Sequence, residues 1–138
     1  MSEKEKYLKE ECPCGLPNNY ENCCYVYHST KTHAPDAETM MRARYSAYVF
    51  CEIDYLIKTI PLLHRKSFDR KSTKHWSQNA QWLGLEIVSS KETHGGEKAQ
   101  VEFKAKYIFE NEQQLHHERS TFEKIQGRWF FVDAKMLA

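Results

Sequence analysis

Four cysteines lie close together near the start of the chain, at Cys12, Cys14, Cys23 and Cys24, in the spacing Cys-x-Cys-x8-Cys-Cys. Thiolate sulfur is a preferred zinc ligand, and two cysteine pairs joined by a short loop can supply four thiolates to one tetrahedral ion. The sequence therefore predicts a zinc site made of these four residues. Four protein ligands leave no open position for water, so we expect this zinc to be structural rather than catalytic.

Disulfides are the alternative use of these cysteines. The chain shows no apolar leader segment and no run long enough to span a membrane, so we expect a cytoplasmic protein, in which thiols stay reduced. A disulfide between the adjacent Cys23 and Cys24 would also be strained. Cys51 is expected to be a small buried apolar residue. His28 and His33 follow the four cysteines, and we expect them outside the ligand set.

The charge balance narrows the class of partner. The chain has 138 residues, with 20 lysines and arginines against 19 acidic residues, for a net charge of +1. Four thiolates and one zinc ion would change that by −4 and +2, to about −1. Nucleic-acid-binding proteins usually carry a marked basic excess. We therefore expect a protein or a small molecule as partner and no nucleic acid.

The remaining elements are predicted as helices first and strands afterwards. Asp36 is a candidate N-cap for a helix that begins at Ala37, and a second helix is expected over 53–59. Residues 64–80 are mostly polar, with Phe68 and Trp76 as isolated apolar anchors, and are predicted as a helix or a mixture of loop and helix. From Trp82 the apolar period changes to two, which predicts four strands, at 82–89, 99–110, 112–124 and 128–134. The run His94-Gly95-Gly96 predicts a turn between the first two strands. Helices followed by an antiparallel meander indicate an α+β fold.

Two parts of the sequence resemble a known family. The run CPCGLPNNYENCC at 12–24 resembles the SEC-C motif, a small zinc-binding module. The rest resembles the YchJ-like family in the stretches APDAETMMRARYSAYV, DYLIKT, WLGLEIV, HERSTFEK and GRWFFVDA, at 34–49, 54–59, 82–88, 117–124 and 127–134. The resemblance implies a SEC-C module at 1–34 followed by a nuclear transport factor 2-like domain at 35–138. That cystatin-like fold is a cone of helices on a curved antiparallel sheet, and it usually binds ligands in the cavity of the cone.

The loop between the cysteine pairs departs from the usual SEC-C pattern. That loop usually carries Gly-Ser-Gly and several lysines, whereas residues 15–22 hold no basic residue. The departure removes the support that lysine-rich relatives would give to a polyanionic partner.

Arg44 is the most conspicuous residue of the predicted cavity domain, because it lies within the apolar stripe that includes Met40 and Tyr48. A buried charge must be compensated, and a carboxylate from the sheet is the expected partner. The candidates are Glu102, Glu118 and Asp133. Arg44 would then either fix the helix against the sheet or orient an anionic ligand in the cavity. Arg42 is expected to point away and be solvated.

The acid–base candidates are few. Asp54 opens the second helix and is expected at the cavity mouth, although helix capping also explains it. His116 and His117 are adjacent in a strand, so at most one of them faces the cavity. We therefore list Arg44, Tyr48, Asp54, Glu102, Glu118 and Asp133 as cavity candidates, and no catalytic residue is assigned.

The last predicted strand is apolar on both faces. Trp129, Phe131 and Asp133 share one face, and Phe130 and Val132 share the other. One face should cover the helices, so the other should meet the zinc module or a second subunit; a homodimer through the sheet is expected.

Two classes of function remain. The first is a non-catalytic binding or adaptor protein with a structural zinc module and a cavity-bearing domain. The second is a small isomerase, dehydratase or hydrolase that uses Arg44 with a carboxylate or histidine in the cavity. An open cavity with an unpaired acid or histidine would favour the enzyme, whereas a committed Arg44 and a cavity narrowed by aromatic side chains would favour the binding protein.

Overall fold

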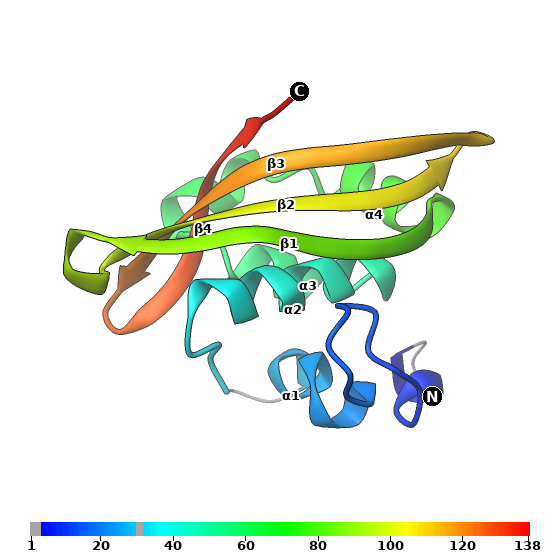
Figure 1. The fold of residues 1–138 in the computed structure, drawn as a ribbon, viewed down its shortest axis with the longest axis horizontal. Coiled ribbons are helices and arrows are strands. Elements are labelled where there is room, and N and C mark those ends of the chain that lie inside the picture. The colour runs from blue at the N-terminus through cyan, green and yellow to red at the C-terminus, as the bar shows by residue number, and fades with distance from the viewer. Residues whose placement is uncertain (1–3, 30–31) are drawn as a thin grey trace.

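A computed structural model describes residues 4–29 and 32–138. The helices and strands follow the predicted order (Figure 1). The α-helices are α1 (Cys24–Ser29), α2 (Ala37–Val49), α3 (Ile53–Lys58) and α4 (Arg70–Asn79). The strands are β1 (Gln81–Thr93), β2 (Lys98–Phe109), β3 (Glu112–Ile125) and β4 (Arg128–Met136). The short 3-10 helices are η1 (Lys4–Tyr7), η2 (Tyr20–Asn22), η3 (Leu62–Ser67) and η4 (His94–Gly96).

The four strands form one antiparallel sheet in the order β1-β2-β3-β4. Helices α2 and α4 pack against its inner face, which confirms the predicted α+β architecture. The turn between β1 and β2 lies where the sequence placed it, since Gly95 and Gly96 both have positive φ. β1 is longer than predicted, because residues 90–93 pair with β2 although their side chains are exposed.

Helix α2 begins where Asp36 caps it, because the Asp36 carboxylate accepts a hydrogen bond of 2.7 Å from the Thr39 amide. The helix is buried on two sides. Met40, Met41 and Tyr45 pack in one hydrophobic cluster with the inner face of the sheet. A second cluster joins the opposite side of α2, and α3, to the N-terminal segment; its buried members are Cys12, Cys14, Tyr20, Cys24, Ala43, Ala47, Phe50, Ile53, Tyr55 and Leu56.

The N-terminal segment therefore lies on the far side of α2 from the sheet (Figure 1). The N-terminal segment does not cover the outer face of β4, so the zinc module is not what meets that face, as one of our two alternatives predicted. A second subunit on the sheet stays a prediction, as does the division into domains at residue 34.

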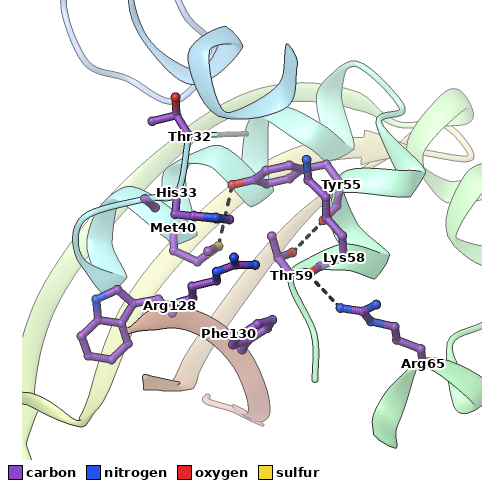
Figure 2. Close-up of a pocket in the computed structure, with 11 residues that line it drawn as sticks. Thr32, His33, Met40, Tyr55, Lys58, Thr59, Arg65, Arg128 and Phe130 are labelled. Carbon is purple, nitrogen blue, oxygen red and sulfur yellow. Dashed lines mark hydrogen bonds between the residues drawn. The ribbon is translucent and has the colours of Figure 1, made fainter. Parts of the chain in front are cut away.

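Several hollows lie between the described elements, and two of them are lined by residues of functional interest. The first, which we call the cone cavity, lies between α2, α4 and the inner face of the sheet, with a volume of about 110 Å³. The second, which we call the cationic hollow, lies between residues 32–34, α3, η3 and the start of β4, with a volume of about 320 Å³ (Figure 2).

Candidate functional site

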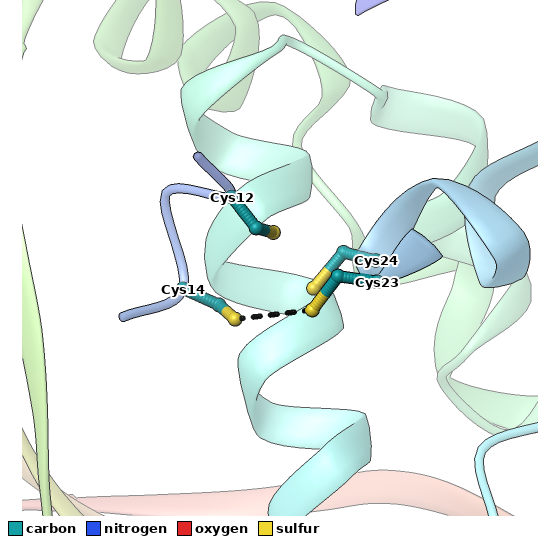
Figure 3. A group of neighbouring side chains, drawn as sticks. All are labelled: Cys12, Cys14, Cys23 and Cys24. Atoms are coloured by element: carbon teal, nitrogen blue, oxygen red, sulfur yellow. Dashed lines mark hydrogen bonds between the residues drawn. The ribbon is translucent and has the colours of Figure 1, made fainter. Parts of the chain in front are cut away.

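The four predicted cysteines converge on one point (Figure 3). We call residues 12–24 the cysteine knuckle. Its four Sγ atoms all lie within 4.8 Å of one another, and those of Cys14 and Cys23 are 3.6 Å apart. In a tetrahedral zinc–thiolate site with Zn–S bonds of about 2.3 Å, neighbouring sulfurs are about 3.8 Å apart. Cys12, Cys14 and Cys24 are buried and Cys23 is half-buried. The donor set and its spacing therefore fit one tetrahedral metal ion.

Local backbone features explain why the knuckle closes. Gly15 follows the first cysteine pair with a φ of +94°, and a side chain there would come within 3.4 Å of the Leu85 carbonyl oxygen. Glycine is the residue that adopts such a φ without strain. Cys24 begins α1, so the adjacent Cys23 and Cys24 can both turn their thiols inward. The Cys12 sulfur also lies 3.6 Å from the hydroxyl of Ser46 on α2.

Arg42 corrects one sequence prediction. Its side chain is not solvated, because only 15% is exposed and its Nη1 donates to the Cys14 carbonyl over 2.7 Å. Its Nε also pairs with Glu38 at 3.1 Å. Arg42 thus ties the first cysteine pair to helix α2.

The crowded thiols perturb one another. Hydrogen bonds from Cys14 and Cys24 hold the pKa of Cys12 far below its ordinary value, while the shared hydrogen bond with Cys12 raises the pKa of Cys14 to about 12. A hydrogen bond from Cys24 lowers the pKa of Cys23 to about 7. The pKa of Cys24 is raised by its hydrogen bonds to the other three thiols. Thiolate character in such a cluster is what a metal cation requires of its ligands.

A buried polar pair joins the knuckle to α2. The Tyr20 hydroxyl lies 2.6 Å from Nδ1 of His28, and Nε2 of His28 lies 2.8 Å from the Ala43 carbonyl. A carbonyl can only accept, so Nε2 carries a proton and donates it. His28 therefore contacts the helix rather than the thiols, as the sequence predicted.

The cone cavity is lined mainly by aromatic and apolar side chains from α2, α4 and the sheet. Edge-on and tilted ring contacts pack Trp76 against Tyr48, Trp82 and Tyr107. These rings reduce the cavity to about 110 Å³. Its lining is Met41, Arg44, Tyr45, Tyr48, Trp76, Trp82, Phe103, Ala105, His116, Glu118, Ser120 and Phe131.

Arg44 is buried, with 5% of its surface exposed. The prediction that a carboxylate compensates its charge is wrong, because its hydrogen bonds go to a carbonyl and a hydroxyl. Its Nη1 donates to the Leu56 carbonyl over 2.9 Å and to the Thr59 hydroxyl over 2.6 Å. Its guanidinium carbon lies 4.6 Å from the centre of the Phe131 ring, a cation–π contact. Burial lowers the pKa of Arg44, and electrostatic interactions with Tyr48, Tyr55 and Glu118 oppose the shift. Arg44 thus fastens α2 to the end of α3.

Glu118 lines the cone cavity but pairs with other groups. Its Oε1 lies 2.7 Å from Nε2 of His116, and its Oε2 accepts a hydrogen bond from the buried Ser120 hydroxyl. His116 faces the cavity and His117 faces the other side of the sheet, as strand alternation requires. The carboxylate and histidine of this cavity are therefore engaged with each other.

The other three acidic candidates lie elsewhere. Asp54 is 88% exposed and pairs with Arg70 at 2.7 Å, so it does not reach the cavity. Glu102 is on the outer face of β2, where its carboxylate bonds His117 at 2.8 Å. Hydrogen bonding to His117 lowers the pKa of Glu102.

Asp133 is displaced by a β-bulge. The register between β3 and β4 shifts where Phe122 pairs with Phe131 and Thr121 pairs with Asp133. Val132 is the extra residue, so the side chain of Asp133 leaves the inner face that Phe131 occupies and is exposed. Simple alternation, on which the prediction rested, does not hold across a bulge.

Several lining residues were not identified from the sequence. His116 was considered only as one of two adjacent histidines, and the strand alternation that excluded one of them was the available signal. Trp76 is predicted only as an isolated apolar anchor, because the residues around it are mostly polar and show no apolar period. No local pattern in 64–80 shows which elements its side chain meets.

Comparison with known proteins now identifies the family. Residues 36–134 match the family model described as the YchJ middle domain, which is nuclear transport factor 2-like. The chain belongs to the YchJ-like family. This confirms the resemblance and the fold that it implied.

Relatives agree with that assignment over nearly the whole chain. A UPF0225 protein of Haemophilus influenzae strain PittEE is 39% identical over 133 residues, covering 96% of this chain and 82% of the relative. A UPF0225 protein of Actinobacillus succinogenes is 40% identical over 123 residues, covering 89% and 80%.

Solved structures extend the likeness to the cysteine knuckle. The solution structure of a SEC-C motif-containing protein from Rhodopseudomonas palustris matches with a TM-score of 0.84 and 32% identity, covering 93% of this chain and 99% of the other. A SEC-C motif-containing protein from Psychrobacter arcticus matches with a TM-score of 0.85 and 32% identity, covering 96% of this chain and 86% of the other.

Among the described residues, no helix is both long and apolar enough to cross a membrane.

Proposed function

We propose that this YchJ-like protein is a non-catalytic binding or adaptor protein of the cytoplasm, with one structural zinc ion in its cysteine knuckle. The observation that carries the binding role is the state of the cone cavity: Arg44 is committed to Leu56 and Thr59, and aromatic rings narrow the cavity. A zinc ion held by four thiolates has no open position. Reduced thiolates also fit the cytoplasm.

Zinc would be held by Cys12, Cys14, Cys23 and Cys24, and it would supply a fixed crosslink between the two halves of the knuckle. We expect Cys12→Ser to lower the zinc content of the purified protein well below one ion per chain. The matched control is Cys51→Ser, since Cys51 is a half-buried cysteine outside the cluster. An equal zinc content in both variants would contradict the assignment.

The cone cavity would hold a small, mostly apolar molecule with one polar group. Its walls are aromatic, and the paired His116 and Glu118 provide a local polar contact. Phenol is a suitable probe, and we expect it to shift the NMR signals of Trp82 and His116 in a saturable way. Ala105→Leu fills the cavity and should abolish these shifts. A protein that shows no shifts, or unchanged shifts in Ala105→Leu, would refute the cavity as a binding site.

Overpacking itself needs a control. Ala99 is another buried alanine of β2, but it does not line the cone cavity. Ala99→Leu should cost a similar free energy of unfolding, about 1–3 kcal/mol, and keep the phenol shifts.

One observation favours the second candidate, a small enzyme of the isomerase, dehydratase or hydrolase class. His116 and Glu118 form a hydrogen-bonded pair inside a cavity, which is an arrangement that can move a proton. If a substrate is found, Glu118→Gln should lower turnover by about 100-fold or more under the enzyme hypothesis. Retained turnover in Glu118→Gln would exclude this pair as its catalyst.

A further inference from the structure

The cationic hollow gathers basic side chains from four separate segments (Figure 2). Lys58 ends α3, Arg65 lies in η3, Arg128 begins β4, and His33 lies between α1 and α2. In Figure 2, Arg128 lies in the middle of the hollow with His33 near it, and Lys58 and Arg65 lie to one side. No acidic side chain lines it among the described residues. Three permanent positive charges therefore share one concave surface.

These three cations lack the carboxylate partner that several other basic side chains have. Lys9, Arg42, Arg70, Lys98 and Arg119 each pair with a carboxylate. Within residues 4–29 and 32–138, no carboxylate lies within ion-pair distance of Lys58, Arg65 or Arg128. Like charges crowded in a cleft concentrate a positive potential there. Desolvation lowers the pKa of His33, and the positive charges of Arg128 and Lys58 lower it further.

Two of the cations are held in position. Arg65 donates from Nε to the Ile60 carbonyl over 3.1 Å and from Nη2 to the Lys58 carbonyl over 3.2 Å. The ammonium group of Lys58 lies 5.3 Å from the centre of the Tyr55 ring. Fixed donors lose less entropy when they bind a ligand, and a planar guanidinium matches a tetrahedral oxyanion through two parallel hydrogen bonds.

The floor of the hollow adds a neutral donor and apolar surface. Tyr55 is 4% exposed, and its hydroxyl donates to the Met40 sulfur over 3.8 Å, a weak acceptor. Burial raises the pKa of Tyr55, so the phenol keeps its proton at neutral pH. The ring of Phe130 forms part of the wall, and the buried Trp129 lies beside it.

We propose that the cationic hollow binds a phosphate-bearing small molecule, with Arg128, Lys58 and Arg65 around the phosphate and Phe130 against the apolar remainder. A phosphate monoester carries a charge between about −1.5 and −2 at neutral pH, which suits three cations better than a single carboxylate does. The volume of about 320 Å³ exceeds that of phosphate alone and lies at the lower end for ligand pockets. This site is separate from the cone cavity and does not depend on it.

The test is an NMR titration of the full-length, metal-loaded protein with phenyl phosphate, inorganic phosphate and benzyl alcohol at constant ionic strength. We expect phenyl phosphate to shift the amide signals of Tyr55, Thr59 and Phe130, and to bind more tightly than inorganic phosphate because the ring adds apolar contact. Benzyl alcohol should leave these signals in place.

Variants that each remove one positive charge distinguish specific phosphate binding in the cationic hollow from general electrostatic attraction to the protein surface. Arg128→Gln and Lys58→Gln should each weaken phenyl phosphate binding by at least about tenfold, the loss expected for one charge-assisted hydrogen bond. Lys106→Gln removes the same charge from the exposed face of β2 and should change the affinity by less than about twofold.

Three results would overturn the proposal. The first is the absence of shifts in the hollow with either phosphate. The second is an equal loss of affinity in Arg128→Gln and Lys106→Gln. The third is a single-stranded oligonucleotide that shifts the same signals at lower concentration than phenyl phosphate, since the ligand would then be a nucleic acid. Failure of the phenol test in the cone cavity leaves this site unaffected, because the two probes report on different residues.

Discussion

Replacing Arg44 with methionine tests how a buried cation is held at the centre of the protein. The substitution keeps an unbranched chain of similar length but removes two hydrogen bonds, to Leu56 and Thr59. A hydrogen bond to a charged group contributes about 1.5–3 kcal/mol. The variant no longer desolvates a guanidinium, which recovers several kcal/mol. The expected net loss in the free energy of unfolding is about 1–2 kcal/mol.

The size of this loss in unfolding free energy depends on whether Thr59 and Leu56 keep hydrogen-bond partners in the variant. Thr59 Oγ1 still lies 2.8 Å from the Tyr55 carbonyl and 3.2 Å from the Leu56 carbonyl, so no charged or orphaned group remains in the core. Had Arg44 paired with a buried carboxylate, its removal would cost about 3–5 kcal/mol, because the acid would lose its counter-charge. The expected loss in the free energy of unfolding of Arg44→Met is therefore about 2 kcal/mol smaller without a carboxylate partner than with one.

Urea unfolding, followed by tryptophan fluorescence, measures the difference. A double-mutant cycle with Thr59→Val should give a coupling energy of about 1 kcal/mol, because both changes remove the same hydrogen bond. Lys106→Gln serves as a surface control and should stay within about 0.5 kcal/mol of the wild type. A loss above about 3 kcal/mol that Glu118→Gln relieves would refute the reasoning, since it would reveal an ion pair between Arg44 and Glu118.

Three further predictions concern other parts of the fold. Gly15→Ala should lower the free energy of unfolding by about 1 kcal/mol more than Gly95→Ala. Gly15 has a φ of +94° and a carbonyl oxygen 3.4 Å from the new methyl group, whereas nothing lies within 4 Å at Gly95. Thermal unfolding of the two variants measures the difference in stability. Tyr20→Phe leaves His28 without its hydroxyl partner, so stability should fall by about 1 kcal/mol and hydrogen exchange in α1 should rise, and unchanged exchange would contradict the coupling. Burial raises the pKa of Tyr45 from 10 to about 12, so the unfolded chain ionises first and stability falls between these pH values; Tyr45→Phe should reduce that fall in alkaline denaturation.

The parts of the fold that could be predicted from the sequence are those with a local signal. Asp36 before Ala37 marked the start of α2, and the glycines at 95 and 96 marked the β1–β2 turn. The cysteine spacing brought four residues together because their separation is short. Local periodicity was enough to recognise an antiparallel sheet after helices.

The parts that could not be predicted depend on tertiary contacts. The face of α2 that meets the knuckle is lined by Ala43 and Ala47, small residues that add little to an apolar stripe. Arg44 was expected to need a carboxylate, but a helix C-terminus supplied a carbonyl and a hydroxyl instead. The end of α3 lies beside Arg44 only in the folded protein.

The two hollows could not be predicted from the sequence either, because residues far apart in the chain line them. Arg128 is separated from His33 by 95 positions, and nothing in the sequence around either residue indicates that the two side chains line the same hollow. A one-residue bulge at Val132 likewise changed the face on which Asp133 lies. Neither a long-range contact nor a bulge leaves a periodic signal in the sequence.

A closed zinc site in the cysteine knuckle would exclude chemistry at the metal and leave ligand binding to the nuclear transport factor 2-like domain. Zinc K-edge X-ray absorption on the purified protein, with elemental analysis, tests it directly. We predict one zinc per chain with four sulfur neighbours at about 2.3 Å and no nitrogen or oxygen in the first shell. A zinc ion with an oxygen or nitrogen ligand, or a protein that folds with no metal in the knuckle, would contradict a closed zinc site.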